Sequence, residues 1–474
     1  MSENKNLKAL KDNLKKLEYT NKNVYGNSEK HNTADCAAFC DDYMKFLDES
    51  KTERLCVKNA VSLLAANGFK SFESFTEAPQ TGDKFYHVHR NKAIIAGIIG
   101  AEPVANGFNL IIAHTDSPRL DLKPQPLYES DGMALMKTHY YGGIKKYQWT
   151  SVPLELHGVV VKKDGSKVDV HIGGGDNDPV FFLSDLLPHL ARKQMTKRAS
   201  EVINGEDMNV LVGSMPLPDD KEAKTVKLNT LRLLNEAYGI EEEDFYSAEL
   251  TFVPAFKARY VGFDKSLIGS YGHDDRVCAY TALRALLSAE TPQRTAICAF
   301  TDKEEIGSMG VTGIQSAYFQ NFAADLGDWY GVSARKILSR SFCLSGDVDG
   351  GFDPNYADAF DSNNSARLNG GIAMAKYTGA GGKYDTSDAA AETVGKIRKL
   401  FNDNNITWQL GELGKVDQGG GGTVAQYMAN LDVETIDCGV AVIAMHSPYE
   451  LVAAADVYMT YLGFKAFFEK FDNR

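Results

Sequence analysis

Cysteine is scarce in this sequence. Seven cysteines occur among 474 residues, the number is odd, and no two of them have the CxxC spacing of a thiolate metal site. A small secreted protein held together by disulfides would contain many more paired cysteines. The scarcity argues against a disulfide framework and against a cysteine-bound zinc ion, and we predict a cytoplasmic location, where thiols stay reduced.

Long apolar runs and an excess of positive charge are also missing. The longest apolar runs, such as residues 94–101 and 440–445, are far shorter than the roughly 20 residues that span a bilayer. Residues 1–20 scatter lysines and lack the continuous apolar core of a secretory signal. Lys plus Arg total 51 against 63 for Asp plus Glu, a net charge of −12, which disfavours binding to nucleic acid or anionic lipid. We predict a soluble protein without nucleic-acid or membrane partners.

The composition that is present is typical of a large globular protein. The chain is 43% hydrophobic and 24% charged, which argues against disorder or a fibrous structure. Its length is about three times the roughly 150 residues of a common domain, so we expect two domains. Residues 34–47 and 54–67 have apolar residues at helical spacing, and short apolar runs at 85–89, 93–99 and 110–113 predict strands.

In the middle of the chain, apolar and polar residues alternate more often, and turn-forming residues are more frequent. Residues 154–161 and 167–172 alternate on either side of a Lys-Asp-Gly-Ser turn and predict a β-hairpin. We predict that residues 125–256 form an inserted, β-rich domain, which divides another domain into residues 1–124 and 257–474.

Beyond residue 260, helical and strand patterns alternate, which is typical of an α/β fold. The sequence has no internal repeat with a period of roughly 20 to 50 residues, so solenoids and propellers are excluded. The predicted elements are a helix at 276–288, strands at 295–300 and 342–345, a helix at 387–401, a strand at 435–445 and a helix at 454–470.

Polar side chains follow directly on four of the apolar strands. His114 comes after LIIA, and Asp347 follows FCLS by two residues. Glu304 and Glu305 follow AICAF, and His446 follows VAVIAM. In an open α/β sheet, ligands bind beyond the carboxyl ends of the strands. We therefore predict that these side chains converge on one site.

Asp274 is a further candidate, because GHDDR directly precedes the predicted helix at 276–288; its alternative role is that of a helix N-cap. With Asp274, Asp347 and one of the two glutamates, the candidates offer two imidazoles and three carboxylates but no thiolate, which is the ligand set of zinc or a harder divalent ion. A central carboxylate can bridge two ions. The residues therefore predict a dinuclear, zinc-type centre.

The acidic pair Glu304 and Glu305 has the chemistry that hydrolysis needs, because one carboxylate can bind metal while the other acts as general base toward water. Asp116 lies two residues after His114, so its side chain can reach back to the imidazole and fix its tautomer. Each feature alone has an ordinary structural alternative, since single histidines are often structural and acidic pairs are often solvated. The combination carries the prediction.

Residues 419–422 are four consecutive glycines, but the Lys-Ser or Lys-Thr pair of a phosphate loop is missing. We predict a loop that faces the substrate, with an ordinary turn as the alternative. The absence of a G-x-S-x-G motif and of a marked cysteine argues against covalent catalysis. Structural roles are favoured for His87, His89, His139, His157 and His171.

Five motifs carry a resemblance to a known family. Through them, in family order and at family-like separations, the whole chain resembles the M18 family of metallo-aminopeptidases. The motifs are AHTDSPRLDLKP at 113–124, HDDRVCAY at 273–280, DKEEIGSMG at 302–310, SGDVDGGFDPNY at 345–356 and AMHSPYE at 444–450.

The resemblance implies two divalent metal ions per subunit, with zinc first and cobalt or manganese as alternatives. It also implies that Asp274 bridges the ions, that Glu304 is the general base and that Asp116 orients His114. The implied ligands are His114, Asp274, Glu305, Asp347 and His446.

The resemblance further implies a catalytic domain with a mixed sheet flanked by helices, and an inserted β-rich domain for dimerisation. The dimers of such proteins assemble into a tetrahedral dodecamer. His189, in LSDLLPHL, is similar to a family histidine that reaches from the partner subunit to polarise the substrate carbonyl. Its alternative role is that of a structural histidine in the inserted domain.

Departures from the aspartyl-specific relatives bear on the substrate. The chain has DGGFDP at 349–354, where those relatives have AHAVHP, and it carries GELGKVDQGGGGT at 411–423. In one register, Met374 replaces a lysine that would pair with an acidic substrate side chain. We predict an aminopeptidase for N-terminal neutral or apolar residues such as Leu or Met. The alternatives are an aspartyl or glutamyl aminopeptidase, a metal-dependent carboxypeptidase or deacylase, and a non-catalytic scaffold particle.

Overall fold

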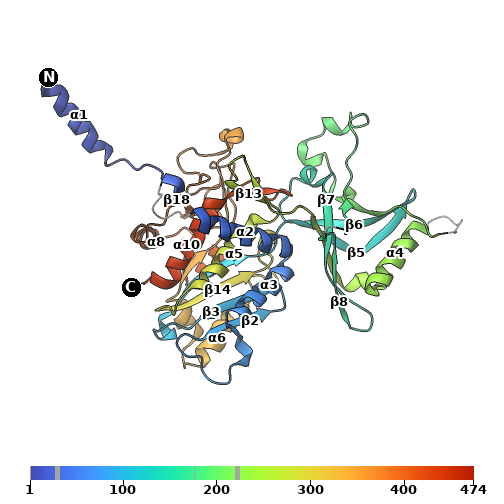
Figure 1. Ribbon diagram of the computed structural model, residues 1–474, viewed down its shortest axis with the longest axis horizontal. Coiled ribbons are helices and arrows are strands. Elements are labelled where there is room, and N and C mark those ends of the chain that lie inside the picture. The colour runs from blue at the N-terminus through green and yellow to red at the C-terminus, as the bar shows by residue number, and fades with distance from the viewer. Residues whose placement is uncertain (1, 27–32, 176, 219–224, 474) are drawn as a thin grey trace.

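The computed structural model describes residues 2–26, 33–175, 177–218 and 225–473. These residues form three β-sheets with helices packed around them. Figure 1 shows the sheet of β5 to β8 and helix α4 in a lobe beside a larger body, while helix α1 extends away from that body. The arrangement confirms the predicted α/β class. Among the described residues, no helix is both long and apolar enough to cross a membrane.

The largest sheet is mixed, with adjacent parallel strands β14, β4, β15 and β19 at its centre. Every residue of β3, β4 and β14 is buried, which explains their continuous apolar sequences, since helices cover both faces. In sheet order, the strands are β1 (Lys70–Ser71), β2 (Lys84–His89), β3 (Ala93–Ile98), β14 (Thr295–Thr301), β4 (Phe108–His114), β15 (Phe342–Ser345), β19 (Glu434–Gly439), β17 (Ile372–Ala375) and β18 (Trp408–Leu410).

Two hydrophobic cores lie on opposite faces of this nine-stranded sheet. Ile111 belongs to one core, and its neighbours Leu110 and Ile112 belong to the other, as expected for the two-residue period of a strand. The first core includes α2 (Thr33–Glu49), α3 (Glu53–Ala66), α5 (His273–Ser288), α8 (Ala391–Asp403) and α10 (Ala454–Lys470). The second includes α6 (Tyr318–Asp328), α7 (Ala334–Leu338) and α9 (Ala425–Ala429), whereas α1 (Ser2–Lys15) stands apart.

The second sheet has its own core, which contains Trp149 and Phe252. Strand β11 pairs with both β5 and β7, so the sheet closes into a barrel-like ring, and β7 and β8 form the predicted hairpin. Strand β5 begins at Arg119, so the predicted boundary after residue 124 lies within it; the domain boundaries stay a prediction. The elements are β5 (Arg119–Ser130), β6 (Met133–Tyr141), β7 (Pro153–Val161), β8 (Lys167–Ile172), β9 (Phe181–Phe182), β10 (Asn209–Gly213), α4 (Thr225–Tyr238) and β11 (Ala248–Pro254).

The third sheet shows where one predicted strand was wrong. The single strand expected at 435–445 is divided, because β19 belongs to the nine-stranded sheet and β20 to the third sheet. Strand β19 ends at Gly439 and β20 begins at Ala441. At Gly439 the chain passes so close to Asp347 that a Cβ would lie 1.8 Å from its backbone oxygen, so this position requires glycine. In sheet order, the strands are β12 (Arg259–Val261), β13 (Leu267–Ser270), β21 (Glu450–Ala453), β20 (Ala441–Ile443) and β16 (Asp349–Gly350).

Helix α8 also differs from the prediction, since it begins at Ala391 rather than at residue 387. The Ala389 N–H donates to the Lys376 carbonyl over 2.8 Å. This bond ties the preceding residues to another segment, so the helix starts after it.

Candidate active site

Three neighbouring parallel strands bring most of the predicted site residues together. His114 is the last residue of β4, Asp347 follows β15, and the turn η9 (Glu304–Ile306) follows β14. Asp274 and His446 approach from the third sheet, because Asp274 follows β13 and His446 follows β20. The predicted convergence is therefore found, but two sheets produce it rather than one.

Asp274 lies between the two histidines. Its Oδ1 is 3.1 Å from His114 Nε2 and its Oδ2 is 3.1 Å from His446 Nε2. Asp347 Oδ1 lies 3.7 Å from His114 Nε2, and Glu305 Oε2 lies 3.4 Å from His446 Nε2. Two groups of side chains result, each with one histidine and one acid, and they share the carboxylate of Asp274.

Burial disfavours the negative charge of the acidic pair. It is the main cause that raises the pKa of Glu304 to about 8, with Asp347 adding to the shift and His114 opposing it. Burial and the charge of Asp274 raise the pKa of Glu305 well above its usual value. Burial alone would lower the pKa of His446, but its contacts with Asp274 and Glu305 raise it to about 11. The environment therefore favours added positive charge.

The donor atoms fit divalent cations. Both carboxylate oxygens of Asp275 and Oε1 of Glu305 are buried and lack a hydrogen-bond partner, although buried carboxylates are normally paired or bound to metal. Ligand atoms of His114, Asp274 and Glu305 lie within 4.8 Å of one another, and so do those of His114, Asp275 and Asp347. Imidazole and carboxylate donors without thiolate suit zinc and similar ions.

Backbone carbonyls orient both histidines. His114 Nδ1 donates to the backbone oxygen of Asp116 over 2.9 Å, and His446 Nδ1 donates to that of Gly143 over 2.7 Å. Each bond leaves Nε2 facing Asp274. The side chain of Asp116 instead accepts the backbone N–H groups of Glu304 (3.1 Å) and Glu305 (3.2 Å), and its Oδ1 lies 3.5 Å from His114 Nδ1. Asp116 therefore holds the turn that carries the acidic pair.

The family model described as aminopeptidase I zinc metalloprotease (M18) matches residues 46–468. The chain belongs to the M18 family. Membership confirms the predicted resemblance and the prediction of a metallo-aminopeptidase.

Relatives within the M18 family cover almost the whole chain. A protein from Clostridium acetobutylicum named probable M18 family aminopeptidase 1 is 47% identical over 453 residues, which cover 94% of this chain and 97% of that protein. The crystal structure of the M18 aminopeptidase from Thermotoga maritima has a TM-score of 0.92 at 45% identity, covering 96% of this chain and all of that one. The S. cerevisiae mApe1 dodecamer shares the fold, with a TM-score of 0.75 at 21% identity over 93% of this chain and 98% of that one.

Two acidic residues at this M18 site had no role in the sequence prediction. Asp275 lies within ligand distance of His114 and Asp347. Glu450 is 1% exposed, and it accepts the backbone N–H of His446 over 2.7 Å and that of Asp274 over 3.1 Å. Both residues lie inside the motifs HDDR and AMHSPYE, so each follows a predicted ligand closely in sequence. That proximity was the available signal.

A cavity of about 500 Å³ opens beside the acidic pair of the M18 site and is also lined by residues 420–422. The glycine loop thus borders the cavity, and its predicted position facing the substrate stays a prediction. At Gly420 the φ angle is +110°, and a Cβ would lie 1.8 Å from the Gly379 backbone oxygen, so the loop requires glycine there. Met374 is buried in the core, and its neighbours Ala373 and Ala375 line the cavity instead.

His189 lies apart from the other predicted residues. It follows β9, it is exposed, and it is not among the residues that line the cavity. Within one M18 subunit, the structure therefore brings together seven of the eight predicted residues and leaves His189 on the surface of the second sheet's lobe.

Proposed function

We propose that the chain is a dinuclear metal-dependent aminopeptidase that removes the N-terminal residue from peptides. The observation that carries the proposal is Asp274, whose two oxygens each face a different histidine. One ion would be held beside His114 and Asp347, the other beside His446 and Glu305, and both by Asp274. Zinc is the first choice of metal, with cobalt or manganese as alternatives.

Bound divalent ions would supply Lewis acidity, which lowers the pKa of water and polarises a peptide carbonyl. Glu304 borders the cavity and would take the proton from the attacking water, then donate it to the leaving amine. Asp116 would keep Glu304 in place, because it accepts the backbone N–H groups of that turn. In this proposal, Glu304 transfers the proton and Asp116 positions Glu304.

The cavity lining favours neutral or apolar N-terminal residues such as Leu or Met. Val348, Leu413 and Met445 contribute apolar surface. Burial raises the pKa of both Asp349 and Asp437 to about 7, and these lining carboxyls offer no positive charge to an acidic side chain. This lining argues against the aspartyl or glutamyl alternative. The measurement is kcat/KM for Leu-, Asp- and Glu-p-nitroanilide. Asp or Glu derivatives that are cleaved at least tenfold better than Leu would contradict the proposed preference.

The lining also bears on the carboxypeptidase alternative, which needs a basic residue to hold a substrate carboxylate. Among the described residues that line the cavity, none is Lys or Arg. A scaffold particle is the remaining alternative, and the presence of Glu304 together with all the predicted ligands disfavours it.

We also propose that the chain forms dimers through residues 125–256 and that these assemble into a tetrahedral dodecamer. Leu187, Leu190 and Met195 are at least half exposed on this lobe, and exposed apolar clusters often mark interfaces. His189 lies among them and would reach the site of a partner subunit. A particle of twelve times the 52.0 kDa chain mass in sedimentation is the expected result, and a monomer that is active at full rate would contradict it.

A cytoplasmic location is part of the same proposal. It is supported by the seven cysteines, which are all free thiols, as a reducing compartment would keep them.

The deciding experiment measures Leu-p-nitroanilide hydrolysis and bound metal for wild type and Glu304→Gln, after chelation and after zinc, cobalt or manganese is returned. We expect about two ions per chain in both proteins. Wild type should regain activity, while kcat of the variant stays at least about 10²-fold lower. Glu77→Gln, at an exposed position, is the matched control. Wild type that binds metal but releases no N-terminal residue would favour the deacylase or scaffold alternatives.

A further inference from the structure

Three consecutive residues at the end of β6 each approach a different part of the site. The Tyr141 hydroxyl donates to Asp116 Oδ2 over 2.8 Å. Gly142 lies so close to Glu305 that a Cβ there would be 3.2 Å from Oε2. The Gly143 carbonyl accepts from His446 Nδ1. The second sheet, which carries none of the proposed ligands, therefore touches the metal site through residues 141–143.

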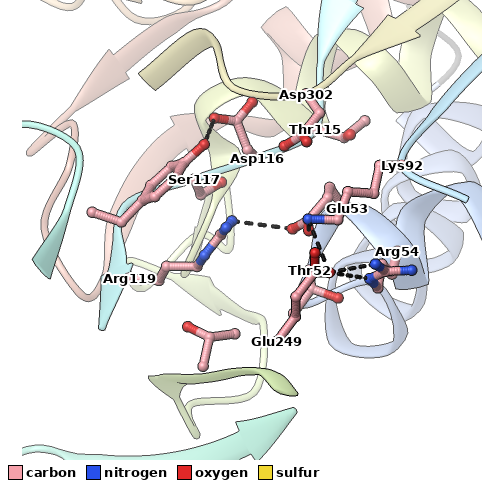
Figure 2. A network of polar contacts seen from close by, with 12 residues as sticks. Thr52, Glu53, Arg54, Lys92, Thr115, Asp116, Ser117, Arg119, Glu249 and Asp302 are labelled. Carbon is pink, nitrogen blue, oxygen red and sulfur yellow. Dashed lines mark hydrogen bonds and ion pairs between the residues drawn. The ribbon is translucent and has the colours of Figure 1, made fainter. Parts of the chain in front are cut away.

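Tyr141 is itself held firmly. Its side chain is nearly buried, at 7% exposure, and the Arg119 guanidinium lies 3.9 Å from its ring centroid, a distance at which a cation is attracted to the ring. Arg119 in turn forms ion pairs with Glu53 (3.1 Å) and Asp121 (2.7 Å). Figure 2 shows Arg119 pointing toward Glu53, which Lys92 also meets. Side chains of α3 and the second sheet thus fix the ring.

We propose that Tyr141 is a positioning residue for the M18 reaction, acting through Asp116 on the turn of Glu304 and Glu305. Asp116 Oδ2 accepts from both the Tyr141 hydroxyl and the Glu305 N–H. Loss of the hydroxyl leaves this carboxylate free to turn away from the backbone N–H groups. The effect on catalysis rests on the proposed function, whereas the effect on the turn and on metal binding does not.

The expected size of the effect follows from the location of Tyr141 behind the ligands. Residues that support ligands from behind typically change metal affinity or activity by about 10- to 100-fold. A shift of the general base by about 1 Å can cost about 100-fold in rate. A residue that serves folding alone would lower the unfolding temperature without changing these quantities in the folded protein.

The test compares Tyr141→Phe with Tyr140→Phe in the full chain. Tyr140 is the adjacent residue of β6 and is 39% exposed, so its variant is a matched control. In the metal-free protein, we expect Tyr141→Phe to speed hydrogen exchange of the peptide containing Glu304 and Glu305. With Co²⁺ as the probe, we expect about 10-fold weaker binding in chelator competition and a changed absorption spectrum. With Leu-p-nitroanilide, kcat should fall about 10- to 100-fold while KM changes little.

Unchanged hydrogen exchange and Co²⁺ binding in a folded Tyr141→Phe protein would overturn the proposal. If that variant does not fold, Arg119→Lys decides the question, since it keeps a cation near Glu53 but removes the planar group over the ring. It should speed exchange of the same turn, and wild-type exchange would overturn the proposal. If wild type cleaves no peptide, the proposed function fails, but the exchange and Co²⁺ measurements still judge Tyr141.

Discussion

The nine-stranded sheet and the second sheet contribute to the site in different ways. The parallel strands β14, β4 and β15 have continuous apolar sequences and end in polar residues, so their carboxyl ends supply chemical groups. The antiparallel strands of the second sheet enclose a separate core, and their contribution is a hydrogen bond from Tyr141 and a carbonyl from Gly143. Of these two sheets, the nine-stranded sheet carries reactive groups, as the third sheet does with Asp274 and His446, and the second sheet supports them.

The ion pairs at the junction of the two sheets are buried, whereas those on the outer face of the second sheet's lobe are exposed. At the junction, Lys92, Glu53 and Arg119 are at most 10% exposed along their side chains and pair with one another. On the outer face of the second sheet's lobe, the α4 pair Arg232 and Glu236 is 43% and 58% exposed. Buried pairs are costly to break, whereas exposed pairs contribute little. The junction should therefore be far more sensitive to substitution than the outer face.

The largest expected effect comes from the shared carboxylate. Asp274→Asn keeps the size of the side chain but removes the charge between His114 and His446, so it should reduce bound metal and lower kcat/KM by more than about 100-fold, since residues behind the ligands alone cost about 10- to 100-fold. Metal counting and Leu-p-nitroanilide kinetics are the measurements. Asp264→Asn is the control at an exposed position, and an Asp274→Asn enzyme with two ions and normal kinetics would contradict the prediction.

The separation of the two sheets can be tested through their cores. Phe252 lies fully buried in the core of the second sheet, and Phe319 lies fully buried under the nine-stranded sheet. Replacing either with Ala should cost about 3–5 kcal/mol of unfolding free energy. If residues 125–256 fold as a unit, scanning calorimetry should show two transitions, and Phe252→Ala should lower only one of them. A single transition that both variants lower equally would contradict the predicted domain division.

The sequence predicted the parts of this comparison that depend on local pattern. Buried parallel strands produce continuous apolar runs, so β4, β14 and β15 and the polar residues after them were found correctly. The division of residues 435–445 was not predicted, because its two halves pair with different strands, most of them distant in sequence, β19 with β15 and β17 and β20 with β16 and β21. Periodicity carries no information about such contacts.

The supporting residues of the site escaped prediction for a related reason. Tyr141 acts through one hydrogen bond to Asp116, which is distant in sequence, and Glu450 acts through two bonds from backbone N–H groups. The sequence marks Glu450 only by its closeness to His446, and it does not mark Tyr141. Met374 shows the converse error, since the chemistry assigned to it requires a side chain facing the cavity. The side chain of Met374 on strand β17 lies in the core. The residue type alone does not tell which side of a strand a side chain is on.

A smaller effect is expected at the junction, where Glu53→Gln leaves Arg119 and Lys92 without their shared partner. Burial alone would raise the pKa of Glu53, but these two cations lower it to about 2. The charged form thus stabilises the fold by about 3 kcal/mol above pH about 4.5, and this contribution is lost as pH falls toward about 2. In urea unfolding, the free energy of unfolding of Glu53→Gln should lie below that of wild type at pH 7, and this difference should become smaller in acid. A difference in unfolding free energy that does not change with pH would show that the charge of Glu53 is not its cause.

The smallest effect is expected on the outer face of α4. Glu236→Gln removes the partner of Arg232, as Glu53→Gln does for Arg119, so the two variants are matched in chemistry but differ in exposure. Exposed pairs four residues apart on a helix contribute about 0.3–0.5 kcal/mol, and salt screens them. Urea unfolding of Glu236→Gln should therefore differ from wild type by no more than about 0.5 kcal/mol at low salt, with the difference vanishing at about 1 M salt. If Glu236→Gln lost as much unfolding free energy as Glu53→Gln, the loss of an ion pair would be equally costly at an exposed and at a buried position. Burial at the junction would then not explain the greater sensitivity to substitution that we expect there.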